Sequence, residues 1–347
     1  MKKITIRIIL ILLVLTLIPA GYFGLKYYSS LFKSNVSISG DGTYYLYIPT
    51  GSSFENLMDS LKSSDALISE DAFLAAAKLK KFSAVRPGRY KLQNGMTNRI
   101  LINMLAAGNQ APVRLTLAGN IRTKEKLAEI VSRYIEPDST LLLECFNDNK
   151  FLEEFGVNSN TMLSICILNT YEFYWNTSPD DFVSRMYKEF ERFWTDERKA
   201  KLAQTSLSQM DAITLASIVA EETIKTDEMP KVAGVYLNRL NKGMLLQADP
   251  TVKYAVGDFT LRRVLNRHTE YDSPYNTYKY AGLPPGPICI PSIAAIDAVL
   301  NAEKHDYYYF CAKADFSGYH AFAKTLAQHN QNAKAYQQAL NKERIYR

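Results

Sequence analysis

The sequence predicts an α+β protein made of an N-terminal transmembrane helix, a small strand–helix module and a larger mixed α+β domain. Three observations predict it. A run of 18 uncharged residues lies near the start, short strand patterns followed by helix patterns come next, and helices separated by turn-rich loops fill the rest. The chain has 347 residues, 47% hydrophobic and 22% charged, so it is long enough to bury more than one core. We therefore divide it into residues 1–28, 29–42, 43–110 and 111–347.

The uncharged run, Ile8 to Leu25, predicts a single-pass membrane anchor within residues 1–28. A helix of that length is about 27 Å long, close to the thickness of the bilayer's hydrocarbon core. Three basic residues precede the run, which predicts a cytoplasmic N-terminus and an extracytoplasmic remainder. A cleaved signal peptide is the alternative, but Ile18-Pro19-Ala20 matches a cleavage site poorly. We therefore expect the anchor to remain attached.

Charge and spacing exclude two kinds of ligand. The formal net charge is +6, but residues 1–28 hold four basic and no acidic residues, which leaves 37 basic against 35 acidic residues elsewhere. Such a balance gives no clustered positive field, so nucleic-acid binding is not expected. The four histidines and four cysteines form no HExxH or CxxC pattern, so we expect no metal and no other cofactor.

The four cysteines are widely spaced and each has apolar neighbours. This favours buried free thiols, although one disulfide in an oxidising compartment stays open as an alternative. The residues concerned are Cys145, Cys166, Cys289 and Cys311.

After a polar, Ser/Gly-rich tether at residues 29–42, a strand followed by a helix is predicted three times. Each helix begins after a Ser or Thr whose side chain can cap it. The strands are Tyr44–Ile48, Gly88–Leu92 and Val113–Leu117, and the caps are Ser53, Thr97 and Thr123. An extra helix is expected between the first two units. Residues 43–110 hold no catalytic constellation, so we assign them to recognition or spacing.

From about residue 125 to 210 the pattern is mostly helical, interrupted by a loop-like aromatic stretch at Leu168–Trp175. Aromatic residues at this density are typical of a core, and a sugar-binding platform is the alternative. A capping box, Ser208 to Asp211, then opens a helix that carries two adjacent carboxylates, Glu221 and Glu222.

The helical period separates these two carboxylates. Glu222 continues an apolar stripe that includes Leu215 and Val219, whereas Glu221 shares a polar face with Lys225, four residues on. We therefore expect Glu221 to be a solvated residue paired with Lys225. Partial desolvation is expected to raise the pKa of Glu222, as a general acid requires. The alternative is a Glu at the rim of the stripe that reaches water or a lysine.

Beyond this helix, loops rich in Pro and Gly present neutral polar side chains, as in the segments containing Gln247 and Asn276. Asp249 is expected to cap a helix that Pro250 begins. Amides and hydroxyls of this kind suit a ligand with many hydroxyl and acetamide groups. No phosphate-binding loop, nucleophile elbow or Cys–His pair competes with this interpretation.

At these residues the chain resembles a known family. The segments ASIVAEET, VYLNRLNKGMLLQADPTVKYA, SPYNTYKYAGLPPGPICIP and GYHAFAKTLAQHN are similar to those of the YceG-like (MltG) family of endolytic murein transglycosylases. The resemblance implies a YceG-like catalytic domain at 111–347 and a LysM-like module at 43–110. It also implies cleavage of the MurNAc–GlcNAc bond within nascent peptidoglycan, leaving a 1,6-anhydro end. Many members carry two acids on this helix; Ala220 replaces the first, so Glu222 is the residue that matches.

The expected site therefore has Glu222 as the catalytic acid and base, with no metal. Gln247, Tyr275 and Asn276 are expected to orient the sugar acetamide, and Tyr171 and Tyr278 to line the sugar subsites, whereas His320 and His329 are expected to hold loops together. The expected partners are peptidoglycan glycan strands, the membrane and peptidoglycan synthases, with the catalytic domain on the periplasmic side of the cytoplasmic (inner) membrane. A non-catalytic wall-binding scaffold and a hydrolase that uses water are the alternatives.

Overall fold

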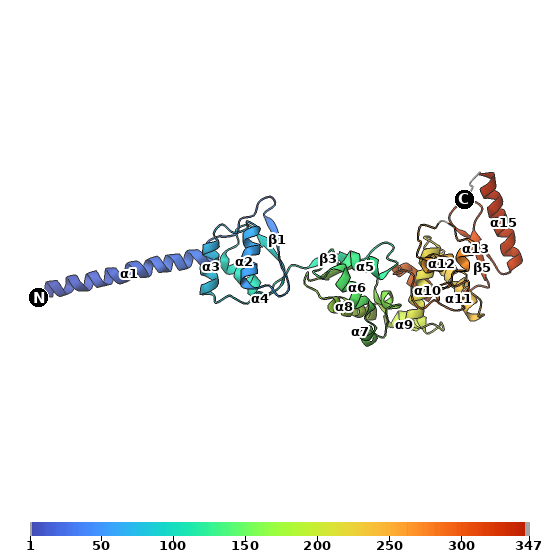
Figure 1. Ribbon diagram of the computed structural model, residues 1–347, viewed down its shortest axis with the longest axis horizontal. Coiled ribbons are helices and arrows are strands. Elements are labelled where there is room, and N and C mark those ends of the chain that lie inside the picture. The colour runs from blue at the N-terminus through green and yellow to red at the C-terminus, as the bar shows by residue number, and fades with distance from the viewer. Residues whose placement is uncertain (1, 262, 344–347) are drawn as a thin grey trace. The chain divides into compact units, whose positions relative to one another are not determined.

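The computed structural model describes residues 2–261 and 263–343; within them, the side chains of residues 2–12, 19, 20 and 23 are not described (Figure 1). The chain divides into two compact units. Unit 1 comprises Met1–Arg114, Tyr134–Glu136 and Glu172–Thr177, and unit 2 comprises Leu115–Arg133, Pro137–Tyr171 and Ser178–Arg347.

Unit 1 begins with the long helix α1 and continues as a small module in which two antiparallel strands pair with Thr43 opposite Gln93. The first two predicted strand–helix units are confirmed, with Ser53 and Thr97 accepting hydrogen bonds from backbone N–H groups of the first helical turn. The elements are α1 (Lys2–Phe32), β1 (Thr43–Ile48), α2 (Phe54–Ser63), α3 (Glu70–Leu79), β2 (Gly88–Gln93) and α4 (Asn98–Ala107).

Helix α1 runs through the segment in which the sequence predicts a membrane anchor. The side chains of residues 8–12, 19, 20 and 23 of that segment lie outside the described ones. Over the residues that the structure describes, no helix is both long enough and apolar enough to cross a membrane.

The residues predicted as a tether are part of the module. Leu31 and Val36 are buried in its apolar core, and the backbone N–H groups of Asn35 and Val36 both donate to the carbonyl of Met96. Two later segments also belong to unit 1: Glu136 accepts hydrogen bonds from the backbone and hydroxyl of Thr50, at 2.7 and 2.6 Å. The polar composition of residues 29–42 hid Leu31 and Val36, which face inward.

Unit 2 is mostly helical, and its strands form short two-stranded pairs. Its elements are β3 (Val113–Thr116, beginning in unit 1), α5 (Lys124–Val131), α6 (Ser139–Asn147), α7 (Asn149–Leu152), η1 (Glu153–Phe155), η2 (Met162–Ile165), β4 (Thr170–Phe173, ending in unit 1), α8 (Pro179–Phe193), α9 (Asp196–Leu202), α10 (Gln209–Glu222), α11 (Met229–Asn241), α12 (Asp249–Val256), α13 (Asn266–Thr269), α14 (Ile293–Leu300), β5 (Tyr309–Ala312), β6 (His320–Ala323) and α15 (Leu326–Lys342).

The third predicted strand–helix unit exists but does not extend the module. Strand β3 pairs with β4 rather than with β1 or β2, and α5 packs against α6. The aromatic stretch at Leu168–Trp175, predicted as a loop, contains β4, along which buried Tyr171 and Phe173 alternate with exposed residues. That alternation with period two is typical of a half-buried strand, and the density of aromatic residues concealed it.

Helix α10 is a central helix of unit 2. Residues 212–219 are all buried, and α10 packs against α11, α12 and α14. The predicted capping box is present: Ser208 accepts from the backbone of Asp211, and the Asp211 carboxylate accepts from the Ser208 backbone. A helix buried on all sides holds its last residue in a fixed position.

All four cysteines are free thiols, and three of them are buried, as the sequence favours. Burial is the main cause that raises the pKa of the Cys145 thiol to about 12, so this group is uncharged and unreactive at neutral pH. Cys311 is half-buried on β5.

Candidate active site

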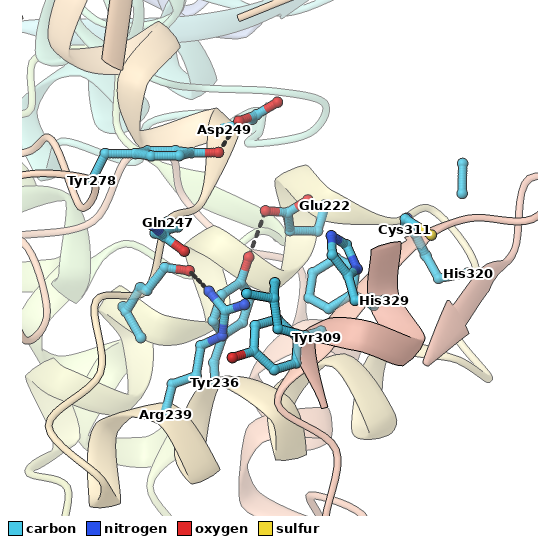
Figure 2. Close-up of a pocket in the computed structure, with 14 residues that line it drawn as sticks. Glu222, Tyr236, Arg239, Gln247, Asp249, Tyr278, Tyr309, Cys311, His320 and His329 are labelled. Atoms are coloured by element: carbon cyan, nitrogen blue, oxygen red, sulfur yellow. Dashed lines mark hydrogen bonds between the residues drawn. The ribbon is translucent and has the colours of Figure 1, made fainter. Parts of the chain in front are cut away.

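A pocket of about 330 Å³ in unit 2 contains Glu222, the last residue of α10. The residue that follows, Thr223, adopts an extended conformation, so the helix ends here. The other walls come from α11, the loop before α12, the hairpin β5–β6 and the first turn of α15. The fold therefore carries one carboxylate from a rigid core helix to the floor of an open pocket (Figure 2).

Near neutral pH the carboxyl group of Glu222 is present in both its protonated and its ionised form. Burial is the main reason why the pKa of Glu222 is raised to about 7, and the negative charge of Asp249 raises this pKa further. A hydrogen bond from the hydroxyl of Tyr236 to Oε1, at 2.6 Å, acts in the opposite direction (Figure 2). Among the described residues, none hydrogen-bonds Oε2, so this oxygen is available to a ligand. The predicted raised pKa is thus present at the predicted residue.

Tyr236 is fixed by its surroundings. It is fully buried on α11, and its ring packs edge-on against Phe310 of β5, with centroids 5.8 Å apart and an interplanar angle of 88°. Burial, with the adjacent Glu222, raises the pKa of the Tyr236 hydroxyl far above its usual range, so it remains a hydrogen-bond donor at any physiological pH.

Arg239, one turn beyond Tyr236, holds the pocket's loops together. Its guanidinium donates to the carbonyls of Tyr308 and Leu246, at 2.6 and 2.7 Å. Gln247, which follows Leu246, adopts a left-handed conformation with φ of 47°, and its backbone N–H donates to the carbonyl of Thr277. A non-glycine residue in this region of φ is strained, and such strain concentrates at functional sites. The backbone therefore forces the exposed amide of Gln247 into the pocket wall.

Asp249, which the sequence predicts as a helix cap, lines the pocket. It is the first residue of α12 and makes no capping bond; instead, its carboxylate accepts from the hydroxyl of Tyr278, at 2.6 Å (Figure 2). Burial, followed by this hydrogen bond, raises the pKa of Tyr278. Two of the predicted sugar-binding residues, Gln247 and Tyr278, thus lie in one pocket with Glu222.

The other three predicted binding residues do not line the pocket. Asn276 is fully buried, and its amide donates to the carbonyls of Thr269 and Tyr271, at 2.9 and 2.7 Å, so it holds a loop. Tyr275 lies against Tyr254, with ring centroids 4.7 Å apart. The hydroxyl of Tyr171 donates to the Ile167 carbonyl at 2.6 Å inside the core around β4. All three were chosen by motif position and side-chain chemistry, which do not reveal what covers a residue in the fold.

The prediction for Glu221 is wrong. Because α10 ends at Glu222, Lys225 is not on the helix and does not pair with Glu221. The carboxylate of Glu221 instead accepts two hydrogen bonds from Arg122, one from Nε at 3.0 Å and one from Nη2 at 2.9 Å. Such a bidentate pair joins α10 to the segment before α5. Adjacent acids on one helix therefore differ in function, because Glu221 is a structural residue and Glu222 faces the pocket.

His320 holds a loop, as predicted. Its backbone N–H and Nδ1 both contact the buried carboxylate of Glu228, each at 2.7 Å, and this ties β6 to the loop that follows Glu222. His329 also lines the pocket, but its Nδ1 has no hydrogen-bond partner among the described residues. Burial lowers the pKa of His329, which keeps its ring neutral. Over the same residues, no group of three or more potential ligand side chains is placed to hold a metal ion.

Three comparisons describe what the chain is similar to. The model of the YceG-like family matches residues 46–335. An endolytic murein transglycosylase of Bacillus subtilis (strain 168) is 32% identical over 309 residues, which cover 85% of each protein. The endolytic murein transglycosylase of Streptococcus pneumoniae serotype 2 (strain D39) is 28% identical over 358 residues, which cover 94% of this chain and 64% of that protein.

Among solved structures, a crystal structure of a yceG-like protein from Listeria monocytogenes is similar to the chain, with a TM-score of 0.54 and 27% identity. The match covers 83% of this chain and 98% of the other.

Proposed function

Because the chain belongs to the YceG-like family, we propose that it is an endolytic murein transglycosylase with Glu222 as its catalytic acid and base. Its curated relatives carry that activity in their names. The observation that carries the assignment of Glu222 is its position: a carboxyl group with a pKa of about 7 lies in an open pocket that polar and aromatic side chains line. The proposed enzyme cleaves the MurNAc–GlcNAc bond within nascent glycan strands and leaves a 1,6-anhydro-MurNAc end.

Glu222 serves both halves of the reaction. In its protonated form it donates its proton to the glycosidic oxygen, and the C–O bond breaks with its electrons leaving on that oxygen. The resulting carboxylate then takes the proton from the sugar's own 6-hydroxyl as this oxygen bonds to the anomeric carbon. An intramolecular nucleophile needs no bound water, and the gain from proximity is large. A pKa of about 7 suits both steps, because both protonation states are then accessible at neutral pH.

Tyr236 and Asp249 stabilise the two charges that develop during the reaction, one on Glu222 and one on the anomeric carbon. The Tyr236 hydroxyl donates to Oε1, and this hydrogen bond strengthens when Glu222 becomes a carboxylate. Asp249 lines the same pocket, so its negative charge favours the positive charge that develops on the anomeric carbon. Tyr278 holds Asp249 in place, and Gln247 presents a neutral amide to the acetamide of MurNAc.

The N-terminal part gives the enzyme its location. Residues 1–28 anchor the chain in the cytoplasmic membrane with a single span, and the catalytic domain lies on the extracytoplasmic (periplasmic) side. The support is the uncharged run from Ile8 to Leu25 with basic residues before it. The module of β1, α2, α3, β2 and α4 is LysM-like and contacts glycan. Peptidoglycan synthases are the partners that supply the glycan strands.

Mass spectrometry of purified glycan digested by the full-length protein tests the proposal. A transglycosylase releases fragments that end in 1,6-anhydro-MurNAc, 18 Da lighter than the product of hydrolysis. Anhydro ends in the wild-type digest, absent with Glu222→Gln, are the expected result. Reducing ends would show a hydrolase that uses water. Intact glycan at every enzyme concentration would show a non-catalytic scaffold.

A further inference from the structure

A second cavity, of about 520 Å³, lies in unit 1 far from the chemistry of Glu222 in the sequence. It is formed where α1 ends, and its walls come from the last turns of α1, the residues directly after it, the start of α3 and Asn98 of α4. Its size is in the range of pockets that hold small ligands or lipid headgroups.

Two lysines give this cavity its charge. Lys26 comes from α1 and Lys33 follows the end of that helix, and within the described part of the chain neither forms an ion pair. Asp71 is the single acidic residue in the lining. Unpaired ammonium groups at the edge of one cavity favour an anion over a neutral sugar, and the exposed hydroxyl of Ser34 adds a hydrogen-bond donor beside them.

The floor of the cavity is preformed. The Asn35 amide donates to Asn98 Oδ1 and to the Ser69 carbonyl, each at 2.9 Å, and its own oxygen accepts from the Ser69 backbone. The Asn98 amide donates in turn to the Ser30 carbonyl of α1, at 2.9 Å. This buried network fixes the end of α1 to α3 and α4, so little ordering is needed when a ligand binds.

The position of the cavity along α1 indicates the source of the anion. Lys26 directly follows the uncharged run that ends at Leu25, and the end of α1 lies only about 10 Å further along the helix axis. Tyr27 and Tyr28 are 50% and 63% exposed, and Ile68 at the rim is 63% exposed. Exposed aromatic residues next to basic ones are typical of the layer in which lipid headgroups lie.

From these observations we propose that the cavity binds the phosphate of an anionic phospholipid headgroup, with Lys26 and Lys33 as its cationic ligands. The inference depends on the proposed membrane anchor, because the anchor sets the cavity at the level of the headgroups. One bound headgroup then fixes the height of the module above the bilayer. A zwitterionic headgroup is disfavoured, because its own ammonium group meets two lysines.

Native mass spectrometry of the full-length protein in detergent micelles, with phosphatidylglycerol or phosphatidylcholine added, tests the proposal. We expect phosphatidylglycerol to be retained at least tenfold better than phosphatidylcholine, and inorganic phosphate not to compete at the same concentration. The double variant Lys26→Ala/Lys33→Ala should lose that preference at least tenfold. Lys78→Ala/Lys80→Ala, which removes the same charge from exposed positions on and after α3, should keep it.

Equal retention of both lipids, competition by inorganic phosphate, or unchanged binding in the Lys26/Lys33 variant would overturn the proposal. Fractionation of cells separates this result from a failure of the anchor. Wild type and both double variants should be found in the membrane fraction. Wild type in the soluble fraction would overturn the anchor and this inference together, while the digestion of glycan by Glu222 would remain as proposed.

Discussion

Two polar clusters, one in each unit, show how the same kind of group serves structure or chemistry. In unit 1, Asn35 and Asn98 are buried, neutral and paired with each other and with the backbone carbonyls of Ser30 on α1 and Ser69, the N-cap of α3. In unit 2, Glu222 is desolvated but receives a single hydrogen bond, from Tyr236. A fully paired neutral cluster stabilises the fold, whereas an underpaired carboxyl group costs stability and gains the ability to exchange a proton at neutral pH.

The sharpest form of the comparison is on α10 itself, where adjacent glutamates differ in the same way. Glu221 accepts two hydrogen bonds from Arg122, whereas Glu222 lies in the pocket with its pKa raised to about 7. Replacing each by Gln keeps the shape and removes the charge. The largest expected effect in the protein is therefore a difference between these two variants.

Glu222→Gln should lower glycan cleavage by about 10³-fold or more, because Gln does not donate a proton to the leaving oxygen. Glu221→Gln should retain activity within about fivefold, with a modest loss of stability of about 1 kcal/mol from the weakened bond to Arg122. The release of soluble glycan fragments measures the first effect. Losses of similar size in the two variants would contradict the assignment of separate roles.

Glu222→Gln should also stabilise the protein at alkaline pH. The folded pKa of Glu222 is about 7 and the ordinary value is 4.5, so the folded state holds a proton that the unfolded chain releases. Wild-type stability therefore falls as pH rises from about 4.5 through about 7, and the loss approaches about 3 kcal/mol above pH 8. Urea unfolding at pH 5 should show similar free energies for the two proteins, and at pH 8 the variant should be the more stable. Equal stabilities at both pH values would refute the desolvation of Glu222.

Asn98→Ala should give the opposite combination, a loss of stability without a change in chemistry. It leaves the buried Asn35 amide and the Ser30 carbonyl without their partner, at a cost of about 2 kcal/mol. Urea unfolding measures the loss, and kcat on soluble glycan fragments should match that of wild type. A lowered kcat in a folded Asn98→Ala protein would show that unit 1 contributes to the chemistry.

Tyr236→Phe should produce the smallest of these effects, and a specific one. The hydrogen bond from Tyr236 lowers the pKa of Glu222, so its removal raises that pKa further. The alkaline limb of the profile of kcat/KM against pH should move to higher pH, and kcat should fall about tenfold, because the carboxylate formed in the first step loses its donor. A fall in rate with an unshifted profile would show that Tyr236 acts on packing alone.

Local signals predicted much of this molecule. Helix periodicity and capping residues identified the first two strand–helix units and α10, and the apolar stripe singled out Glu222. The partners of these residues come from segments far away in the sequence, such as Arg122, which lies 99 residues from Glu221. Periodicity states which face of a helix is covered but not by what, so it missed this pair.

The same limit explains why three of the expected binding residues lie outside the pocket. Asn276 and Gln247 have similar side chains in similar loops, yet one is fully buried against backbone carbonyls and the other lines the pocket. Tertiary contacts distinguish them, because the Asn276 amide is taken up by the carbonyls of Thr269 and Tyr271, whereas Gln247 follows Leu246, whose carbonyl Arg239 of α11 holds. Tyr236 is fully buried on α11, but nothing local in the sequence marks its contact with Glu222.

The proton affinity of Glu222 can be measured directly. Carboxyl carbon NMR of protein labelled at the Glu side chains, compared with the same spectra of Glu222→Gln, assigns the one signal that disappears and follows it with pH. A midpoint near 7 is the expected result, well above the ordinary 4.5 of a Glu. A signal that titrates near 4.5 would contradict the idea that α10 delivers a desolvated acid to this pocket.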